Sequence, residues 1–283
     1  MFLVDESSEL RKILVEIVGE IAGYLRDLVD SNELYRVIGK GASGDQTRLA
    51  DKIAEEMVID LIKREHLCAL IVSEEIGLVK TCDRPEYVVI IDPLDGSMNY
   101  ISKITFASSS IAIAHVEKPY YREILAGAVA NIFLREIYSF DKNNAYLDNI
   151  KIDPNTLKPV IRDTIVIYTS RPELFYSTKV FMRKYMPHGR LRILGSASLE
   201  ICYVGLGRIG LYINDTGKLR NLDIAAASLF AEKLGKKVVD ITGRSIDFRV
   251  DRIEKISTII VGDDEIVSSI TSVLKETGYV QTP

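Results

Sequence analysis

The sequence predicts a mixed α+β and α/β fold, with an antiparallel sheet in the N-terminal half and a smaller α/β unit in the C-terminal half. Residues 105–152 contain several short β-type runs separated by turn residues such as Asp141–Asn144, as in antiparallel sheets. After Asp153, strand and helix patterns alternate, which is typical of α/β folds. No stretch rich in Pro, Gly or Ser separates the halves, so we expect two closely packed domains, residues 1–158 and 159–283.

Two amphipathic helices are expected before the first sheet. Apolar residues recur at helical spacing from Leu10 to Leu25, and a second such pattern runs from Thr47 to Arg64. The Gly-rich segment between them, Ile38–Asp45, should form a mobile surface loop that includes Lys40. A short strand is then expected over Ala69–Ser73.

The remaining elements follow from apolar periodicity and turn residues. In the first half, strands are expected around Ile111 and Ile113 and over Ala126–Phe133, Glu136–Phe140 and Asn149–Ile152. In the second half, we expect strands over 164–168, 191–194, 209–213, 237–239 and 256–261, and helices over 172–185, 196–205, 221–234 and 263–276.

Composition excludes several classes of protein. The net charge is −4 and no basic run is present, so we expect no nucleic-acid partner. No apolar run reaches the roughly 18 residues that a membrane span needs, and acidic residues stand near the N-terminus where a signal peptide would be basic. Three widely spaced cysteines indicate reduced thiols in a cytoplasmic protein.

The histidines and glutamines are also informative. Three scattered histidines give no support for zinc or for imidazole-based nucleophilic catalysis. Any metal must therefore be held mainly by oxygen, which favours Mg²⁺ or Mn²⁺. Few glutamines with abundant Ile, Lys and Glu weakly indicate a thermophile.

The segment 88–99, VVIIDPLDGSMN, carries the strongest chemical signal. Four β-branched residues predict a strand buried on both faces, and Pro93 should end its hydrogen-bond ladder. Asp92 and Asp95 would then stand together at the end of the strand, followed by the backbone amides of Gly96 and Ser97. Carboxylates that bind hard cations beside amides that bind phosphate describe a metal-dependent phosphoryl site. An ordinary Pro-Leu-Asp-Gly turn explains the segment equally well on its own.

Other acidic residues also stand where elements end or begin. Glu74 and Glu75 follow the strand 69–73, Asp223 opens the helix from residue 221, and Asp51 lies in the first turns of the second helix. Each has an ordinary explanation: a solvated loop acid for Glu74, a favourable helix-dipole position for Asp223, and an exposed helix residue for Asp51. Three alanines after Asp223 would let its helix approach closely and deliver a carboxylate to a shared metal.

These motifs in this order resemble the inositol monophosphatase family within the fructose-1,6-bisphosphatase-like superfamily. The resemblance rests on Glu74-Glu75, on Asp92-Pro-Leu-Asp95-Gly-Ser97 and on Asp223-Ile-Ala-Ala, and it covers nearly the whole chain. The Gly-rich loop and Leu219–Asp223 look most like the archaeal branch, whose members often hydrolyse both inositol phosphates and fructose 1,6-bisphosphate. The family resemblance implies a layered α-β-α-β-α sugar-phosphatase fold and a homodimer.

The resemblance also implies roles for individual residues. Glu74, Asp92 and the Leu94 carbonyl would hold a first Mg²⁺, Asp92, Asp95 and Asp223 a second, and Glu74 a weaker third, with Mn²⁺ able to replace Mg²⁺. The amides of Gly96 and Ser97 would bind phosphate. Asp51 would accept the proton of the attacking water through Ser97, with Glu74 as a further catalytic residue, and the loop residues Lys40 and Asp45 would close over the third ion.

Substrate contacts are expected from the second half. Gly195, Ser196 and Ala197 match the position where relatives contact sugar or inositol hydroxyls. Asp215 falls near an acid that binds inositol in animal enzymes, but the segment is one residue longer here, and Leu222 replaces an aromatic residue. Arg171, Arg192, Lys218 and Arg220 could recognise a second phosphate, or they could be surface charges.

The sequence therefore predicts a Mg²⁺-dependent phosphatase that hydrolyses small sugar or inositol phosphates by attack of a metal-activated water. A nucleotide 3′-phosphatase of the same superfamily is the alternative among enzymes. A non-catalytic regulatory binding module is the alternative outside them, although retention of Glu74, Asp92, Asp95 and Asp223 argues against it.

Overall fold

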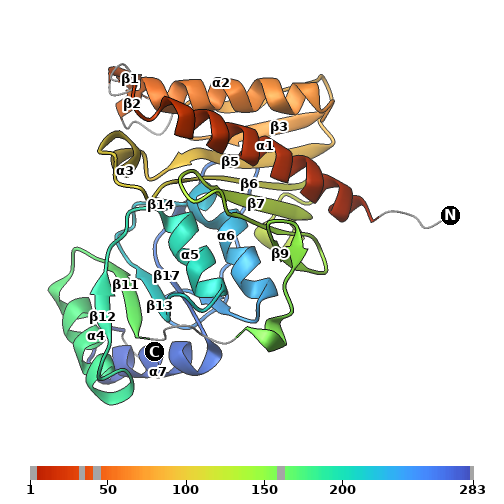
Figure 1. Ribbon diagram of the computed structural model, residues 1–283. Coiled ribbons are helices and arrows are strands. Elements are labelled where there is room, and N and C mark those ends of the chain that lie inside the picture. Colours follow the sequence, from red (N-terminus) through yellow and green to blue (C-terminus); the bar gives the residue numbers. More distant parts are fainter. Residues whose placement is uncertain (1–4, 32–35, 41–45, 158–162, 281–283) are drawn as a thin grey trace.

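The computed structural model describes residues 5–31, 36–40, 46–157 and 163–280, and it stacks five layers of helices and sheets (Figure 1). Helices α1 (Glu6–Leu28) and α2 (Leu49–Arg64) form the first layer and cover one face of a large sheet. Helices α5 (Ala197–Gly205) and α6 (Asn221–Lys233) separate this sheet from a smaller one. Helices α4 (Pro172–Tyr185) and α7 (Asp264–Glu276) cover the far face. The expected α-β-α-β-α layering is confirmed.

The large sheet has eight strands in the order β10-β9-β8-β7-β6-β5-β3-β4. All neighbours are antiparallel except β3 and β5, which run parallel. The strands are β3 (Ala69–Ser73), β4 (Gly77–Lys80), β5 (Tyr87–Asp95), β6 (Ser108–His115), β7 (Ala126–Asn131), β8 (Ile137–Phe140), β9 (Ala145–Leu147) and β10 (Ile150–Lys151).

Strand β5 is buried on both faces, as its four β-branched residues predict. Val88 and Ile90 join the core that contains α5 and α6, whereas Val89 and Ile91 join the core beneath α1 and α2. The expectation that Pro93 ends the ladder is wrong, because β5 continues to Asp95. Its pairing with β6 shifts between Asp92 and Asp95, which pair with Ser110 and Ser108, so a bulge accommodates the missing N–H of Pro93.

The small sheet has five strands in the order β12-β11-β13-β17-β15. They are β11 (Thr164–Tyr168), β12 (Arg190–Arg192), β13 (Leu211–Asn214), β15 (Lys237–Val239) and β17 (Ile259–Gly262). β11 runs parallel to β12 and β13, whereas β17 runs antiparallel to β13 and β15. All four helices expected in this half are present, within one or two residues of the predicted bounds.

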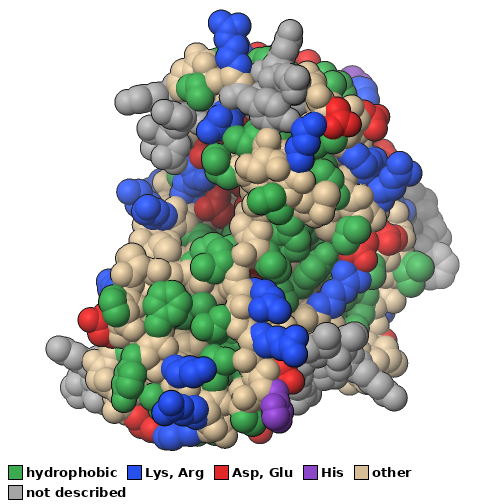
Figure 2. Space-filling model, turned by 60° about the vertical axis from the view of Figure 1, so that its left-hand side comes forward, with side chains coloured by type: hydrophobic (Ala, Val, Ile, Leu, Met, Phe, Trp, Pro, Cys, Tyr) green, Lys and Arg blue, Asp and Glu red, His purple; other side chains and the backbone are tan. Residues whose placement is uncertain are grey.

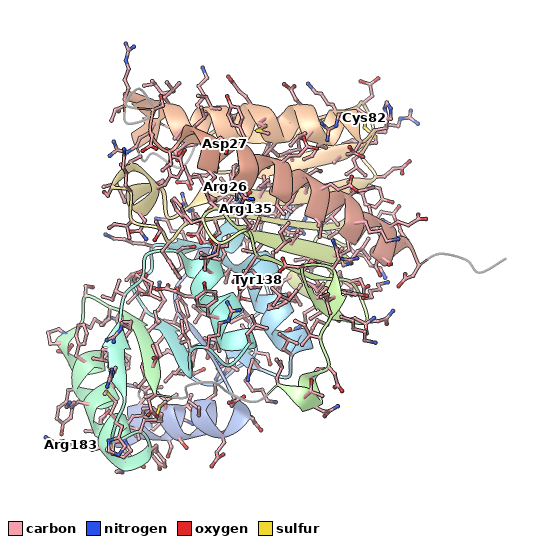
Figure 3. All side chains as sticks on the ribbon, in the orientation of Figure 1. Arg26, Asp27, Cys82, Arg135, Tyr138 and Arg183 are labelled. Atoms are coloured by element: carbon pink, nitrogen blue, oxygen red, sulfur yellow. A yellow bond between two sulfur atoms is a disulfide. The ribbon has the colours of Figure 1, made fainter. Side chains whose placement is uncertain are left out.

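The core between the two sheets joins the halves of the chain. Tyr138 of the large sheet is fully buried there (Figure 3), and its ring meets those of Tyr203 on α5 and Phe230 on α6. The alanines Ala225–Ala227 of α6 are buried in the same core. Packing on both sides therefore fixes the start of α6 relative to the end of β5.

Short elements complete the chain. Strands β1 (Val37–Lys40) and β2 (Gln46–Arg48) pair before α2, and α3 (Ser97–Ile101) follows β5. Strands β14 (Leu219–Arg220) and β16 (Lys255–Ile256) also pair with each other. The loop expected over Ile38–Asp45 is wrong for residues 38–40, which belong to β1 because they pair with β2. Asp45 and the boundary expected after residue 158 lie outside the described residues. Within the described ranges, no helix combines the length and apolarity that a bilayer crossing would require.

The expectation that all cysteines are reduced is wrong, because Cys68 and Cys82 form a disulfide. The cause is strand β4, whose short pattern of half-exposed residues gave no signal in the sequence. β4 pairs with β3 so that Leu70 faces Lys80, and the same register brings Cys68 and Cys82 to a Cα–Cα distance of 5.4 Å. Cys82 lies at the edge of the molecule (Figure 3), and Cys202 is a buried free thiol.

We expect the Cys68→Ala/Cys82→Ala double variant to lose about 3 kcal/mol of unfolding free energy, the usual effect of a disulfide that closes a loop of this length. Dithiothreitol should lower the Tm of the wild type to that of the double variant and leave the variant unchanged. Thiol titration of the denatured wild type without reductant should find one thiol per chain, and three would contradict the disulfide.

Candidate active site

A pocket of about 560 Å³ lies where the ends of β3 and β5 meet the starts of α2, α5 and α6. On the face that Figure 2 shows, acidic side chains are recessed in a hollow with Lys and Arg side chains nearby. The residues that line the pocket include Asp51, Glu74, Asp92, Asp95, Gly96, Ser97, Gly195, Ala197, Lys218, Arg220 and Asp223. Most of the site residues predicted from the sequence therefore border one cavity.

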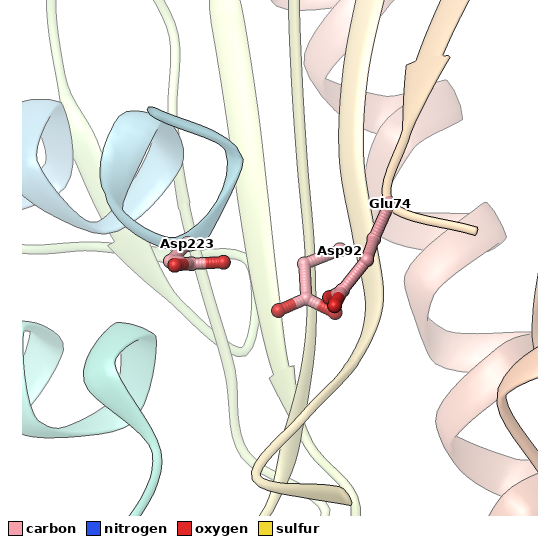
Figure 4. Close-up of side chains that lie close together, drawn as sticks. All are labelled: Glu74, Asp92 and Asp223. Atoms are coloured by element: carbon pink, nitrogen blue, oxygen red, sulfur yellow. The ribbon is translucent and has the colours of Figure 1, made fainter. Parts of the chain in front are cut away.

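Glu74, Asp92 and Asp223 form a compact carboxylate cluster (Figure 4). Glu74 follows β3, Asp92 lies in β5, and Asp223 lies in the first turn of α6. One carboxylate oxygen of each lies within 4.8 Å of the others. Hard oxygen donors converging from three elements suit Mg²⁺ or Mn²⁺. The donor set therefore fits the metal that the sequence predicts.

The electrostatics of this cluster favour a cation. Burial, together with the charges of Asp95, Glu74 and Asp223, raises the pKa of Asp92 well above its usual range. Burial likewise raises the pKa of Asp223 to about 7, despite the nearby charge of Arg220. A divalent ion would offset the repulsion that the neighbouring carboxylates add to the effect of burial.

Arg220 lies inside the cluster. Its guanidinium forms an ion pair with both oxygens of Glu74, and its Nη2 lies 3.5 Å from Oδ1 of Asp223. Its backbone N–H also donates to Oδ2 of Asp223 at 2.7 Å. The side chain predicted to recognise a second phosphate is thus engaged with two of the expected metal ligands.

Asp95 faces a different set of partners from the other three acids. Its Oδ2 accepts hydrogen bonds from the Ser196 hydroxyl at 2.7 Å and from the Ser198 hydroxyl and backbone N–H at 2.6 and 2.8 Å. Burial raises its pKa in spite of these bonds. The structure thus places Asp95 beside the cluster, against the start of α5. Ser198 was not predicted from the sequence, and its one signal is the Ser-x-Ser pattern that opens the helix.

Gly96 fixes the turn after β5. Its φ of +87° lies in the left-handed region, and an added Cβ would lie 2.8 Å from the carbonyl oxygen of Gly195. Asp92 accepts a hydrogen bond from the backbone N–H of Leu94 at 3.1 Å, which closes the preceding bulge. Ser97 follows as the first residue of α3 and lines the pocket.

Two acids approach from α2. Asp51 accepts a hydrogen bond from the Arg48 backbone N–H at 3.1 Å, and burial raises its pKa to about 6. Glu55, one turn further and not predicted from the sequence, accepts hydrogen bonds from the Ser73 hydroxyl and, at 2.8 Å, from the Glu75 backbone N–H. Glu55 thereby holds both residues that flank Glu74, and burial raises its own pKa to about 7.

Only some of the residues expected to contact the substrate line the pocket. Gly195 and Ala197 line the pocket with Lys218, whereas Arg192 lies on the exposed strand β12 and donates to the Leu191 carbonyl. The carboxylate of Asp215 accepts a hydrogen bond from the Tyr279 hydroxyl and lies 3.8 Å from Arg171. Lys40 lies on β1, and nothing is described of its side chain.

Glu200 supports the segment that ends at Ser196. It is fully buried, and its Oε1 accepts hydrogen bonds from the Leu194 backbone N–H at 2.7 Å and the Tyr168 hydroxyl at 2.9 Å. The Tyr168 oxygen in turn accepts a hydrogen bond from the Gly195 N–H at 2.7 Å. Burial raises the pKa of Glu200 to about 8 in spite of these bonds.

We expect Glu200→Gln to match the stability of the wild type near pH 5 and to exceed it by a few kcal/mol at pH 9. A raised pKa means that the folded state holds a proton longer than the unfolded chain, so the contribution of Glu200 is present at low pH and is lost as pH rises through about 8. Glutamine keeps the shape and stays neutral. Urea unfolding at both pH values measures the difference.

The exposed Glu117 provides the control, since Glu117→Gln removes no buried carboxyl group and should give no gain in stability of this size. A Glu200→Gln variant whose stability relative to the wild type does not change with pH would contradict the expectation.

Comparisons with known proteins agree with this geometry. The model of the inositol monophosphatase family matches residues 6–272. An inositol-1-monophosphatase of Aeropyrum pernix is 36% identical over 272 residues, which cover 94% of this chain and 97% of the relative. A fructose-1,6-bisphosphatase/inositol-1-monophosphatase of Methanocaldococcus jannaschii is 29% identical over 240 residues, covering 84% and 88%.

A solved structure from Pyrococcus horikoshii, described as similar to inositol-1 monophosphatase, gives a TM-score of 0.76 at 26% identity and covers 95% of this chain and 100% of its own. The resemblance to the archaeal branch is confirmed. Several relatives come from thermophiles, as the few glutamines and abundant Ile, Lys and Glu of this chain indicate. The chain belongs to the inositol monophosphatase family, and it is a phosphoric monoester hydrolase of a metal-dependent kind.

Proposed function

We propose that this enzyme hydrolyses small phosphomonoesters of a polyol or sugar, inositol 1-phosphate and fructose 1,6-bisphosphate among them, with Mg²⁺ in the Glu74, Asp92 and Asp223 cluster. The observation that carries the proposal is the convergence of these three carboxylates within 4.8 Å at a pocket of about 560 Å³. The names of the relatives from Aeropyrum pernix and Methanocaldococcus jannaschii support the substrate class.

The cluster would hold two or three Mg²⁺ ions, with the Leu94 carbonyl and Asp95 as further ligands and Mn²⁺ able to replace Mg²⁺. When bound, the metal supplies a water of lowered pKa and neutralises charge on the phosphoryl oxygens. Asp95 would have to share its carboxylate between this role and Ser196 and Ser198.

The remaining steps belong to the side chains and amides of the chain. The backbone N–H groups of Gly96 and Ser97, presented by the left-handed turn at Gly96, would bind the phosphate. Asp51 would accept the proton of the attacking water, directly or through Ser97, because a pKa of about 6 leaves it ionised and basic near neutral pH. Glu74 would orient that water together with its metal.

The polyol would lie against the segment Gly195–Ala197, which Tyr168 and Glu200 hold in place. Lys218, at the pocket rim, would meet the second phosphate of a bisphosphate. The homodimer implied by the family resemblance stays a prediction.

We expect Asp223→Asn to lower kcat by more than about 100-fold, because loss of a metal ligand should exceed the 10- to 100-fold cost of losing a residue that only orients one. Phosphate release from inositol 1-phosphate, with Mg²⁺ and with EDTA, is the measurement. Asp141→Asn is the matched control, since Asp141 is also buried but caps a turn outside the pocket. Equal inactivity of wild type and Asp223→Asn on every phosphomonoester would favour a regulatory binding module.

Substrate range requires a separate comparison. Lys218→Ala should raise KM for fructose 1,6-bisphosphate several-fold and leave KM for inositol 1-phosphate unchanged, because only the bisphosphate carries a second anionic group. Equal effects on both substrates would remove the role of Lys218. Faster turnover of a nucleotide 3′-phosphate than of either would favour the nucleotide phosphatase alternative.

A further inference from the structure

The side chain of Arg220 is enclosed by the carboxylates that are expected to hold the metal. Exposure is 17% for the side chain of Arg220, 18% for that of Glu74 and 13% for that of Asp223. Nη2 of Arg220 donates to Oε2 of Glu74 at 2.7 Å while Nη1 pairs with Oε1, so the guanidinium engages both oxygens of Glu74. Such a two-point pair is the strong form of an Arg–carboxylate contact.

This contact uses the same oxygens that a metal ion would need. Both oxygens of Glu74 face the guanidinium, and Asp223 has Oδ1 near Nη2 and Oδ2 on the Arg220 backbone N–H. An ion bound by Glu74 and Asp223 would therefore have to displace the guanidinium, or share oxygens with it. Sharing is costly, since a divalent ion and a guanidinium a few ångströms apart repel each other strongly in a partly buried site.

The position of Arg220 in the chain fixes this arrangement. It is the last residue of β14, and its backbone caps the helix that carries Asp223. The side chain crosses from there to Glu74, which follows β3 in the other half of the chain. One residue thus links the two elements that must approach each other to form the cluster.

We propose that Arg220 is a built-in counter-ion that holds Glu74 and Asp223 together in the metal-free enzyme and competes with the divalent ion for them. The proposal rests on the proposed metal site. Arg220 is then a positioning residue that sets metal affinity, and not a binding residue for a second phosphate. A methionine in its place would keep the apolar stem, remove the charge and leave the carboxylates to the metal alone.

The test is direct titration of Mn²⁺, followed by electron paramagnetic resonance of the free ion, on the full chain purified without metal. We expect Arg220→Met to bind Mn²⁺ at least about tenfold more tightly than the wild type, because a competing positive charge is gone. Without metal, Arg220→Met should have a lower Tm than the wild type. On adding Mn²⁺, its Tm should rise by more than that of the wild type. Arg220→Lys, which keeps the charge without the two-point contact, should fall between them.

Arg208→Met is the matched control. Arg208 makes an equivalent two-point ion pair with Glu136, at 2.8 and 2.9 Å, and it does not line the pocket. The Arg208→Met variant should have a lower Tm than the wild type and the same affinity for Mn²⁺. A general loss of packing would therefore not be mistaken for competition.

The outcomes separate this proposal from the proposed function. Unchanged or weaker Mn²⁺ binding by Arg220→Met would overturn the counter-ion role and leave the metal site intact. Failure of the wild type to bind Mn²⁺ would overturn the metal site itself, and the counter-ion role with it. Tighter binding by Arg220→Met, with an intermediate Arg220→Lys and an unchanged Arg208→Met, supports competition.

Discussion

Mutual repulsion among buried carboxylates is the constraint on which the rest of this structure depends. Glu74, Asp92 and Asp223 bring oxygens within 4.8 Å of one another, and the buried Asp95 adds a fourth carboxylate nearby. Like charges at such distances in a partly dehydrated site destabilise the fold unless a cation or strong hydrogen bonds compensate. Apolar packing has to hold the elements in place against that repulsion.

The layered fold supplies this rigidity. Strand β5 packs on both faces, and α6 is buried along nearly its whole length between the two sheets. Each acid stands where its element ends, begins or bulges, so that the backbone can turn toward the pocket without unpairing the core. The bulge at Pro93 is part of this arrangement, because it keeps Asp92 and Asp95 on a strand that is still paired with β6.

Local patterns predicted the elements and singled out the three acids of the cluster as candidates, because both depend on residues close together in sequence. The family resemblance was needed to assign these acids to one metal site. The run Val88–Ile91 predicted β5, and the alanines after Asp223 predicted a helix that can pack closely. The sequence could not predict the partners of Asp95 and Arg220, since Ser198 and Glu74 lie 103 and 146 residues away from them. The disulfide was missed for a related reason: it depends on the register of a strand with no clear pattern.

Because the clustered carboxylates repel one another, the stability of the enzyme should also depend on the divalent ion that they bind. One guanidinium faces Glu74 and Asp223, while burial and the neighbouring carboxylates raise the pKa of Asp92. A divalent ion that binds the folded chain and not the unfolded one stabilises the fold in proportion to the logarithm of its concentration above Kd. Arg220 reduces that dependence, because it supplies part of the same compensation from within the chain. The fold can therefore tolerate low metal concentrations at the cost of weaker metal binding, and both effects follow from the contacts of one side chain.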